Sequence, residues 1–178
     1  NAVVLGDYLL ARNMELGMRS GQYDLVSYVI ASIATLCEGE LLQSDRAERM
    51  EITRDAYLEI IYKKTASLLG ISAGVGALSA GANREQVARM RRFGDALGMA
   101  FQIQDDILDL VSTAEVLGKP VLSDEKNQKT TYVTLVGLEQ AKKNVEEISA
   151  RAVSLLKELP GNNAFLENLI AMLVERKK

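Results

Sequence analysis

The stretch "GMAFQIQDDILDLV", residues 98–111, places three aspartates in a segment that otherwise reads as a buried helix. With 100° between successive helical residues, Gln102, Asp105, Asp106 and Asp109 fall at i, i+3, i+4 and i+7 and form one polar stripe. Its flanks are apolar, and no lysine or arginine lies within the stretch to pair with the acids. The pattern therefore predicts a polar stripe on the wall of an apolar cavity, and the alternative is an ordinary acidic helix surface.

The clustered carboxylates predict a metal site. Carboxylates this close repel one another, and burying them without a cation is costly, so a positive partner is needed. The chain has no histidine, which excludes Ser-His-Asp and Cys-His nucleophile systems and most zinc sites. Ligation by oxygen alone favours Mg²⁺, Mn²⁺ or Ca²⁺, and Mg²⁺ is usually shared between one or two carboxylates, water and substrate phosphates. We therefore expect Asp105, Asp106 and Asp109 to be the metal ligands of half a magnesium site.

The composition bounds the fold and the partners. The 178 residues correspond to about one domain, and a content of 48% hydrophobic but only 5% aromatic residues with two prolines favours helices. The net charge of -3 provides no basic surface, so nucleic acid is not an expected partner. Cys37 is the only cysteine, which is typical of a chain made for a reducing compartment, and we expect a cytoplasmic protein.

Apolar residues recur at helical spacing along nearly the whole chain, which predicts a single all-α domain over residues 1–178. Asn83 and Gln86 resemble a capping box at the start of the helix that carries the aspartates. A loop is expected over 112–131, where the periodicity is lost. The helices are expected over residues 2–18, 23–44, 53–81, 83–111, 132–159 and 163–178.

One uncharged stretch, residues 65–83, has about the length of a membrane span. It is built mainly from Gly, Ala and Ser, whose transfer into lipid is weakly favourable, and small residues also suit close packing between helices. We therefore expect a packed helix and no transmembrane segment.

Several cations and one amide are candidate ligands for a diphosphate. Lys119 and Lys129 lie in the expected loop after the aspartates, where they could complement a diphosphate whose charge the metal neutralises only in part. Lys64 precedes the uncharged stretch and could face the same cavity, and Gln43 is a polar residue within an apolar periodicity. Taken alone, each of these residues could equally be an ordinary surface residue.

These segments together resemble the trans-isoprenyl diphosphate synthases, the head-to-tail prenyltransferases. "FQIQDDILDL" followed by "LGKP" resembles the second aspartate-rich region of that family. "GDYLLA", "EGELLQ" and "YKKTASLL" resemble three further segments of the family, in the same order along the chain. The resemblance implies a bundle of long helices around a central cavity, a Mg²⁺-dependent activity, and mostly homodimeric assembly.

The resemblance also assigns roles to residues. It implies up to three Mg²⁺ ions, with Mn²⁺ as a possible substitute, bound between two facing aspartate-rich motifs of which Asp105, Asp106 and Asp109 are the second. Of these three aspartates, Asp105 would be the main direct ligand of the metal. Lys64, Lys119, Lys129 and Gln43 would bind the diphosphate groups, and Thr65 and Gln102 would lie near the allylic carbon. The expected catalytic residues are Lys64, Thr65, Gln102, Asp105 and Asp106.

The first aspartate-rich motif does not occur in these residues, so we expect the chain to be the carboxyl-terminal portion of a prenyl synthase whose amino-terminal helices lie upstream. The substrates would be isopentenyl diphosphate and an allylic diphosphate, and the product farnesyl or geranylgeranyl diphosphate. The alternatives are a long-chain synthase making hexaprenyl to octaprenyl diphosphate, a non-catalytic subunit of a heteromeric synthase, a terpene cyclase of the same fold, or a purely structural bundle.

Overall fold

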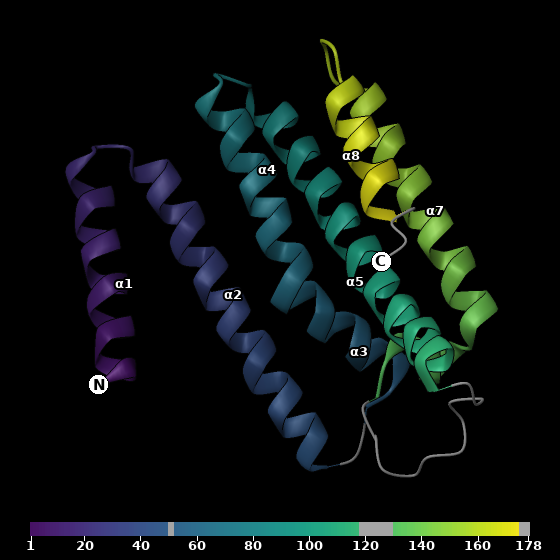
Figure 1. Ribbon diagram of the computed structural model, residues 1–178. Helices are drawn as coiled ribbons and strands as arrows, with labels where there is room; N and C mark the ends of the chain where they lie inside the picture. The colour runs from purple at the N-terminus through teal and green to yellow at the C-terminus, as the bar shows by residue number, and fades with distance from the viewer. Residues whose placement is uncertain (50–51, 118–129, 175–178) are drawn as a thin grey trace.

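The computed structural model describes residues 1–49, 52–117 and 130–174, with side chains omitted for 112–117. Most successive helices run in alternating directions (Figure 1), and the described residues contain no strand, so the predicted all-α class is confirmed. The elements are α1 (Ala2–Arg19), α2 (Tyr23–Glu48), α3 (Arg54–Ile61), the π-helical turn η1 (Tyr62–Ala66), α4 (Ser67–Ser79), α5 (Arg84–Leu117), α6 (Tyr132–Val136), α7 (Leu138–Lys157) and α8 (Ala164–Val174).

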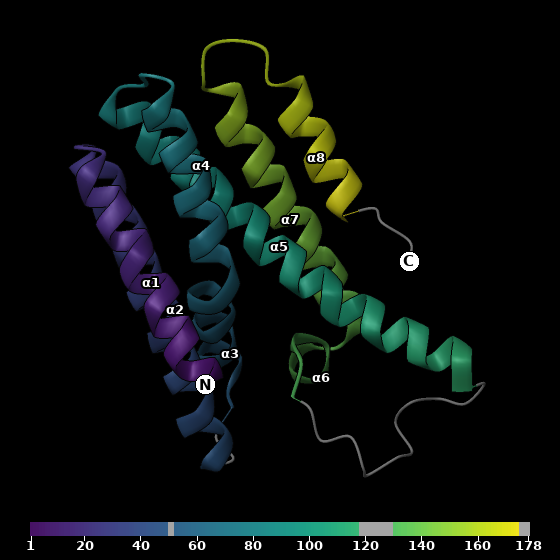
Figure 2. The same cartoon turned by 60° about the vertical axis from the view of Figure 1, so that its left-hand side comes forward.

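Helix α5 is the central element of the bundle. It packs most extensively against α4 on one side and α7 on the other, and the two views agree on this order (Figures 1 and 2). Its amino terminus has the predicted capping box. The backbone N–H of Gln86 donates to Asn83 Oδ1 at 3.0 Å, and the backbone N–H of Asn83 donates to Gln86 Oε1 at 2.9 Å. This reciprocal pair satisfies two backbone donors that the first turn of a helix leaves free.

Four of the expected helices are wrong in their bounds. The helix expected over 53–81 is interrupted by η1, and the one expected over 132–159 is divided at Gly137, whose φ of 83° is incompatible with a continuing helix. Helix α5 continues to Leu117, beyond the predicted start of the loop at 112. Helix α2 continues to Glu48, beyond the predicted end of the helix at 44.

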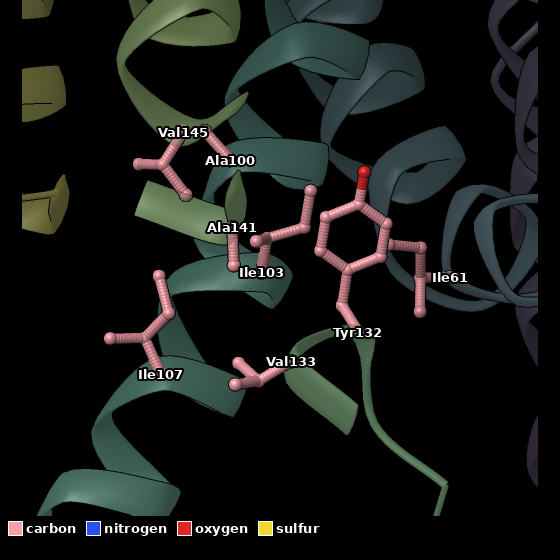
Figure 3. Packing of buried hydrophobic residues seen from close by; sticks show 8 residues of the cluster. All are labelled: Ile61, Ala100, Ile103, Ile107, Tyr132, Val133, Ala141 and Val145. Atoms are coloured by element: carbon pink, nitrogen blue, oxygen red, sulfur yellow. The ribbon is translucent and has the colours of Figure 1, made fainter. Parts of the chain in front are cut away.

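Two apolar clusters hold the bundle together, and the first lies beside the aspartates. It joins α3, α5, α6 and α7, and the ring of Tyr132 lies between Ile61 and Ile103 (Figure 3). The second joins α5, α7 and α8 around Phe93, and Leu156 is one of its buried members. Because α5 contributes to both, its position is set along most of its length.

Helix α2 is exposed and apolar. Its most apolar 18-residue window has a mean hydropathy of 1.5 and is only 11% buried, so by length and composition α2 is able to cross a membrane. An apolar helix that packs against a partner protein has the same properties. The stretch 65–83, which raised the question in the sequence, instead contributes to η1 and the 13-residue α4, and α4 is too short to span a bilayer.

Close packing at Gly39 joins α2 to η1. A Cβ atom at Gly39 would lie 2.8 Å from Lys63 Cβ and 3.1 Å from the backbone N of Lys64. The missing side chain therefore lets the two backbones approach each other beside Lys64.

Substituting Gly39 with Ala is expected to lower the free energy of unfolding by about 1 kcal/mol, because overpacking exceeds the gain in helix propensity. The matched control is Gly76→Ala in α4, where a Cβ would meet no atom within 4 Å. That substitution is expected to stabilise the protein by about 0.5–1 kcal/mol. Urea unfolding measures both values, and a Gly39→Ala protein as stable as Gly76→Ala would contradict the close contact.

The carboxyl group of Asp95 lies between α5 and α4. A Cβ at Gly70 would lie 2.0 Å from Asp95 Oδ1, and within the described chain that buried oxygen has no hydrogen-bond partner. Burial raises the pKa of Asp95 from 3.8 to about 6, and the nearby Arg91 opposes the shift.

A raised pKa in the folded state means that Asp95 stabilises the protein in its protonated form. This contribution is complete below about pH 4 and is lost as the pH rises through about 6. We expect Asp95→Asn to remove this loss, so that its stability relative to the parent rises by about 1 kcal/mol from pH 4 to pH 7, a value reduced for the half-buried position. Thermal unfolding of both proteins across this range measures the difference, and a constant difference would contradict the assignment.

Candidate active site

A pocket of about 820 Å³ lies where the carboxyl-terminal part of α2, α3, η1, α5 and α6 meet. Residues from all of these elements line it, so segments far apart in the sequence contribute to one surface. Five of the predicted site residues are among them. The lining residues are Gln43, Ala47, Ile52, Tyr57, Ile60, Ile61, Lys64, Thr65, Gln102, Asp106, Thr130, Thr134 and Leu135.

The π-helical turn η1 carries Lys64 and Thr65. A π-turn inserts one residue into a helix, shifts the side chains that follow, and occurs often at functional sites. Here neighbouring lysines both reach glutamates of α2: Lys63 Nζ lies 3.2 Å from Glu38 Oε2, and Lys64 Nζ lies 3.0 Å from Glu40 Oε1. The two glutamates flank Gly39, so the close backbone contact and both ion pairs form one junction.

Lys64 is held at the edge of the pocket. Its ammonium group donates to Gln43 Oε1 at 2.5 Å and pairs with Glu40. An ammonium group has three N–H donors, so these two partners orient it and leave one donor for a ligand. Gln43 and Lys64, predicted separately from the sequence, are therefore neighbours, and Glu40 joins them as a partner that the sequence did not single out.

Lys63, in contrast, is directed into protein contacts. It pairs with Glu38 and, at 3.3 Å, with Glu59 one turn earlier. Hydrogen bonds to Glu38 and Glu59 raise the pKa of Lys63. Of the two adjacent lysines, only Lys64 lines the pocket among the described residues.

Thr65 and Gln102 meet inside the pocket. The Thr65 hydroxyl donates to Gln102 Oε1 at 3.1 Å and links η1 to the middle of α5. Gly98, one turn before Gln102, allows this approach, because a Cβ there would lie 2.5 Å from Ala66 Cα. The two residues expected near an allylic carbon therefore form one polar pair with a defined position.

The structure divides the predicted aspartate stripe. Gln102 and Asp106 line the pocket, whereas Asp105 is half-buried, Asp109 is exposed, and neither is among the residues that line the described pocket. Among the described residues, no three carboxylate or cysteine side chains are grouped closely enough to hold a metal ion by themselves. Carboxylate oxygens still suit Mg²⁺ and Mn²⁺ as donors, so the α5 acids fit a metal that takes further ligands from elsewhere.

Asp106 is buried, with 4% of its surface exposed, and it contacts protein groups. Its Oδ2 accepts a hydrogen bond from the Tyr57 hydroxyl at 2.5 Å and another from the backbone N–H of Tyr132 at 2.8 Å. Burial and the bond to Asp106 raise the pKa of Tyr57. Tyr57 was missed in the sequence, although its position seven residues before Lys64 places both on one face of a helix.

Two predicted ligands, Lys119 and Lys129, lie outside the described residues. The next described residue, Thr130, lines the pocket, so the chain re-enters the described structure at this site.

Comparison with known proteins identifies the family. The sequence model of the polyprenyl synthetase family matches residues 1–162. A short chain isoprenyl diphosphate synthase of Methanothermobacter thermautotrophicus is 37% identical over 159 residues, which are 87% of this chain and 48% of the relative. Component 2 of a heptaprenyl diphosphate synthase from Geobacillus stearothermophilus is 39% identical over 137 residues, which are 77% of this chain and 43% of the relative.

The structural comparison agrees. A geranylgeranyl pyrophosphate synthetase from the archaeon Geoglobus acetivorans superimposes with a TM-score of 0.82 at 26% identity, covering 98% of this chain and 66% of that structure. The expected isoprenoid-synthase bundle is thereby confirmed. The chain spans about half the length of the curated relatives it matches. On both sequence and fold, the chain belongs to the polyprenyl synthetase family.

Proposed function

We propose that this chain supplies the second aspartate-rich half of a Mg²⁺-dependent prenyltransferase that condenses isopentenyl diphosphate with an allylic diphosphate. The observation that carries the proposal is the pocket in which Lys64 and Thr65 of η1 meet α5, the helix that carries Gln102 and the aspartates. Because the chain spans about half the length of its relatives, the activity is proposed for the full-length protein, and this chain supplies the pocket.

Lys64 is the described residue that binds the diphosphate in this proposal. Its Nζ is positioned by Gln43 and Glu40, so little side-chain freedom is lost when it bonds a phosphate oxygen. Lys119 and Lys129 are proposed as further diphosphate ligands, as the family resemblance implies. The positive charge gathered in this way favours the diphosphate as a leaving group.

Asp105 and Asp109 are the proposed metal-binding side chains of this half of the site. Their oxygens suit Mg²⁺, with Mn²⁺ as a substitute, and up to three ions are expected when the facing motif is included. Magnesium, when bound, supplies positive charge that stabilises the departing diphosphate. Asp106 was expected to share this role, but its Oδ2 already accepts two protein hydrogen bonds.

The reaction breaks the bond between the allylic carbon and its oxygen, and the electron pair leaves with the diphosphate. The double bond of isopentenyl diphosphate forms the new carbon–carbon bond, and a proton is then lost to the diphosphate or a neighbouring group. The oxygens of Thr65 and Gln102 provide negative dipoles for the allylic cation. Apolar lining residues, among them Ile60, Ile61 and Leu135, exclude water that would quench it.

The product is proposed to be farnesyl or geranylgeranyl diphosphate. A longer product of six to eight isoprene units, or a non-catalytic role in a heteromeric synthase, is the alternative. The similarity to component 2 of a heptaprenyl diphosphate synthase is the reason to test both alternatives. A cytoplasmic location is part of the proposal and fits the single cysteine, Cys37.

A homodimer through α1 and α2 is also proposed. No described residue of α1 is buried, and large apolar side chains of both helices are exposed, including Val4 at 69% and Leu41 at 71%. Apolar patches of this kind mark surfaces that are covered by a partner. Sedimentation of the full-length protein reports directly on this assembly.

The full-length protein, incubated with Mg²⁺, isopentenyl diphosphate and each allylic diphosphate, is expected to elongate the allylic primer, and chromatography identifies the product. We expect Lys64→Ala to lower kcat/KM by about 10- to 150-fold, the range for losing a hydrogen bond to a charged group. Lys157→Ala, at the exposed end of α7, is the control and should retain parental activity. No elongation with any primer would contradict the proposed reaction, and a fully active Lys64→Ala protein would contradict the role of Lys64.

A further inference from the structure

Asp106 differs from the other two aspartates of its motif in what it contacts. Asp105 is half-buried and Asp109 is exposed, whereas Asp106 is 4% exposed and its Oδ2 accepts hydrogen bonds from two other elements. Hydrogen bonds to an ionised carboxylate are about twice as strong as neutral ones. Such a buried carboxylate is satisfied by protein donors, and these donors fix its orientation.

The first donor belongs to the helix that leads to Lys64. Tyr57 lies in α3, and its hydroxyl is 2.5 Å from Asp106 Oδ2. Ile61, in the same helix, and Lys64, in the η1 turn that continues it, line the pocket together with Tyr57. The bond from Tyr57 to Asp106 therefore ties the segment that carries Lys64 to α5.

The second donor is the backbone at the start of α6. The Tyr132 N–H belongs to the first residue of that helix and lies two residues after Thr130, which lines the pocket. The Tyr132 side chain is held in turn: its hydroxyl accepts a hydrogen bond from Asn144 Nδ2 at 2.5 Å, and its ring lies 6.2 Å from that of Tyr57. Asp106 thus joins α3, α5 and α6 at one atom.

We propose that Asp106 is a positioning residue and not a metal ligand. Its Oδ2 holds Tyr57 and the first turn of α6 against α5, and this sets the positions of Lys64 and Thr130 on the wall of the pocket. This inference rests on the proposed prenyltransferase function. It assigns metal binding within the motif to Asp105 and Asp109, and it gives Tyr57 a role in catalysis through Asp106.

The test uses the full-length protein and the variants Asp106→Asn, Tyr57→Phe and the double variant, with Asp105→Asn as the matched control. Mn²⁺ binding in the presence of inorganic diphosphate is measured by electron paramagnetic resonance. We expect Asp106→Asn and Tyr57→Phe to keep Mn²⁺ affinity within about threefold of the parent. Asp105→Asn is expected to weaken it by at least about tenfold, the lower end of losses at metal sites.

The kcat of elongation is the second measurement. Each single variant is expected to lower kcat by about 10- to 100-fold. The double variant is expected to be no less active than the less active single variant, because both substitutions weaken the same hydrogen bond between Tyr57 and Asp106. Should Asp106→Asn fail to fold by circular dichroism, Tyr57→Phe alone decides: a reduced kcat with parental Mn²⁺ affinity supports the inference, and a parental kcat overturns it.

Two results would overturn the positioning role while leaving the enzyme assignment intact. One is a loss of Mn²⁺ affinity in Asp106→Asn as large as that in Asp105→Asn. The other is a double variant whose loss of kcat is the product of the two single losses. A parent protein that elongates no primer would instead contradict the proposed function and, with it, this inference.

Discussion

The close approach of α5 to the preceding helical segment is the constraint on which the rest of the pocket depends. At Gly94 and Gly98 the two backbones are so near that a Cβ would lie 2.4 Å from the Leu69 carbonyl oxygen and 2.5 Å from Ala66 Cα. Only glycine permits this separation. This close approach places Gln102, one turn beyond Gly98, within hydrogen-bonding distance of Thr65.

The polar groups of the pocket are held by protein contacts. Lys64 is oriented by Gln43 and Glu40, Thr65 by Gln102, and Asp106 by Tyr57 and Tyr132. A site whose dipoles and charges are positioned in advance has less reorganisation to undergo when charge develops on a leaving group. The apolar clusters around Ile103 and Phe93 supply the rigidity that this arrangement needs.

Helical periodicity and capping chemistry predicted the fold class and most helix starts, and the Asn83–Gln86 capping box was found as expected. The π-turn at Lys64 was missed because one inserted residue barely alters an apolar pattern that is read over several turns. The break at Gly137 was missed because glycine is also tolerated inside helices, and only its positive φ reveals the turn.

The residues of the candidate site were easier to predict from the sequence than their arrangement in space. Spacing placed Gln102, Asp105, Asp106 and Asp109 on one stripe, but only Gln102 and Asp106 are among the residues that line the described pocket. Tyr57 was overlooked because an aromatic residue at helical spacing ordinarily belongs to a core. Its partner is 49 residues away, and only the fold brings the two together.

The most direct test of the central claim is a crystal structure of the full-length protein with Mn²⁺ and inorganic diphosphate, in which anomalous scattering locates the metal. The account predicts a manganese ion bound by Asp105, a diphosphate oxygen bonded to Lys64 Nζ, and Asp106 still accepting its bonds from Tyr57 and Tyr132. Diphosphate bound away from Lys64, or manganese coordinated by Asp106 with the Tyr57 bond broken, would contradict it.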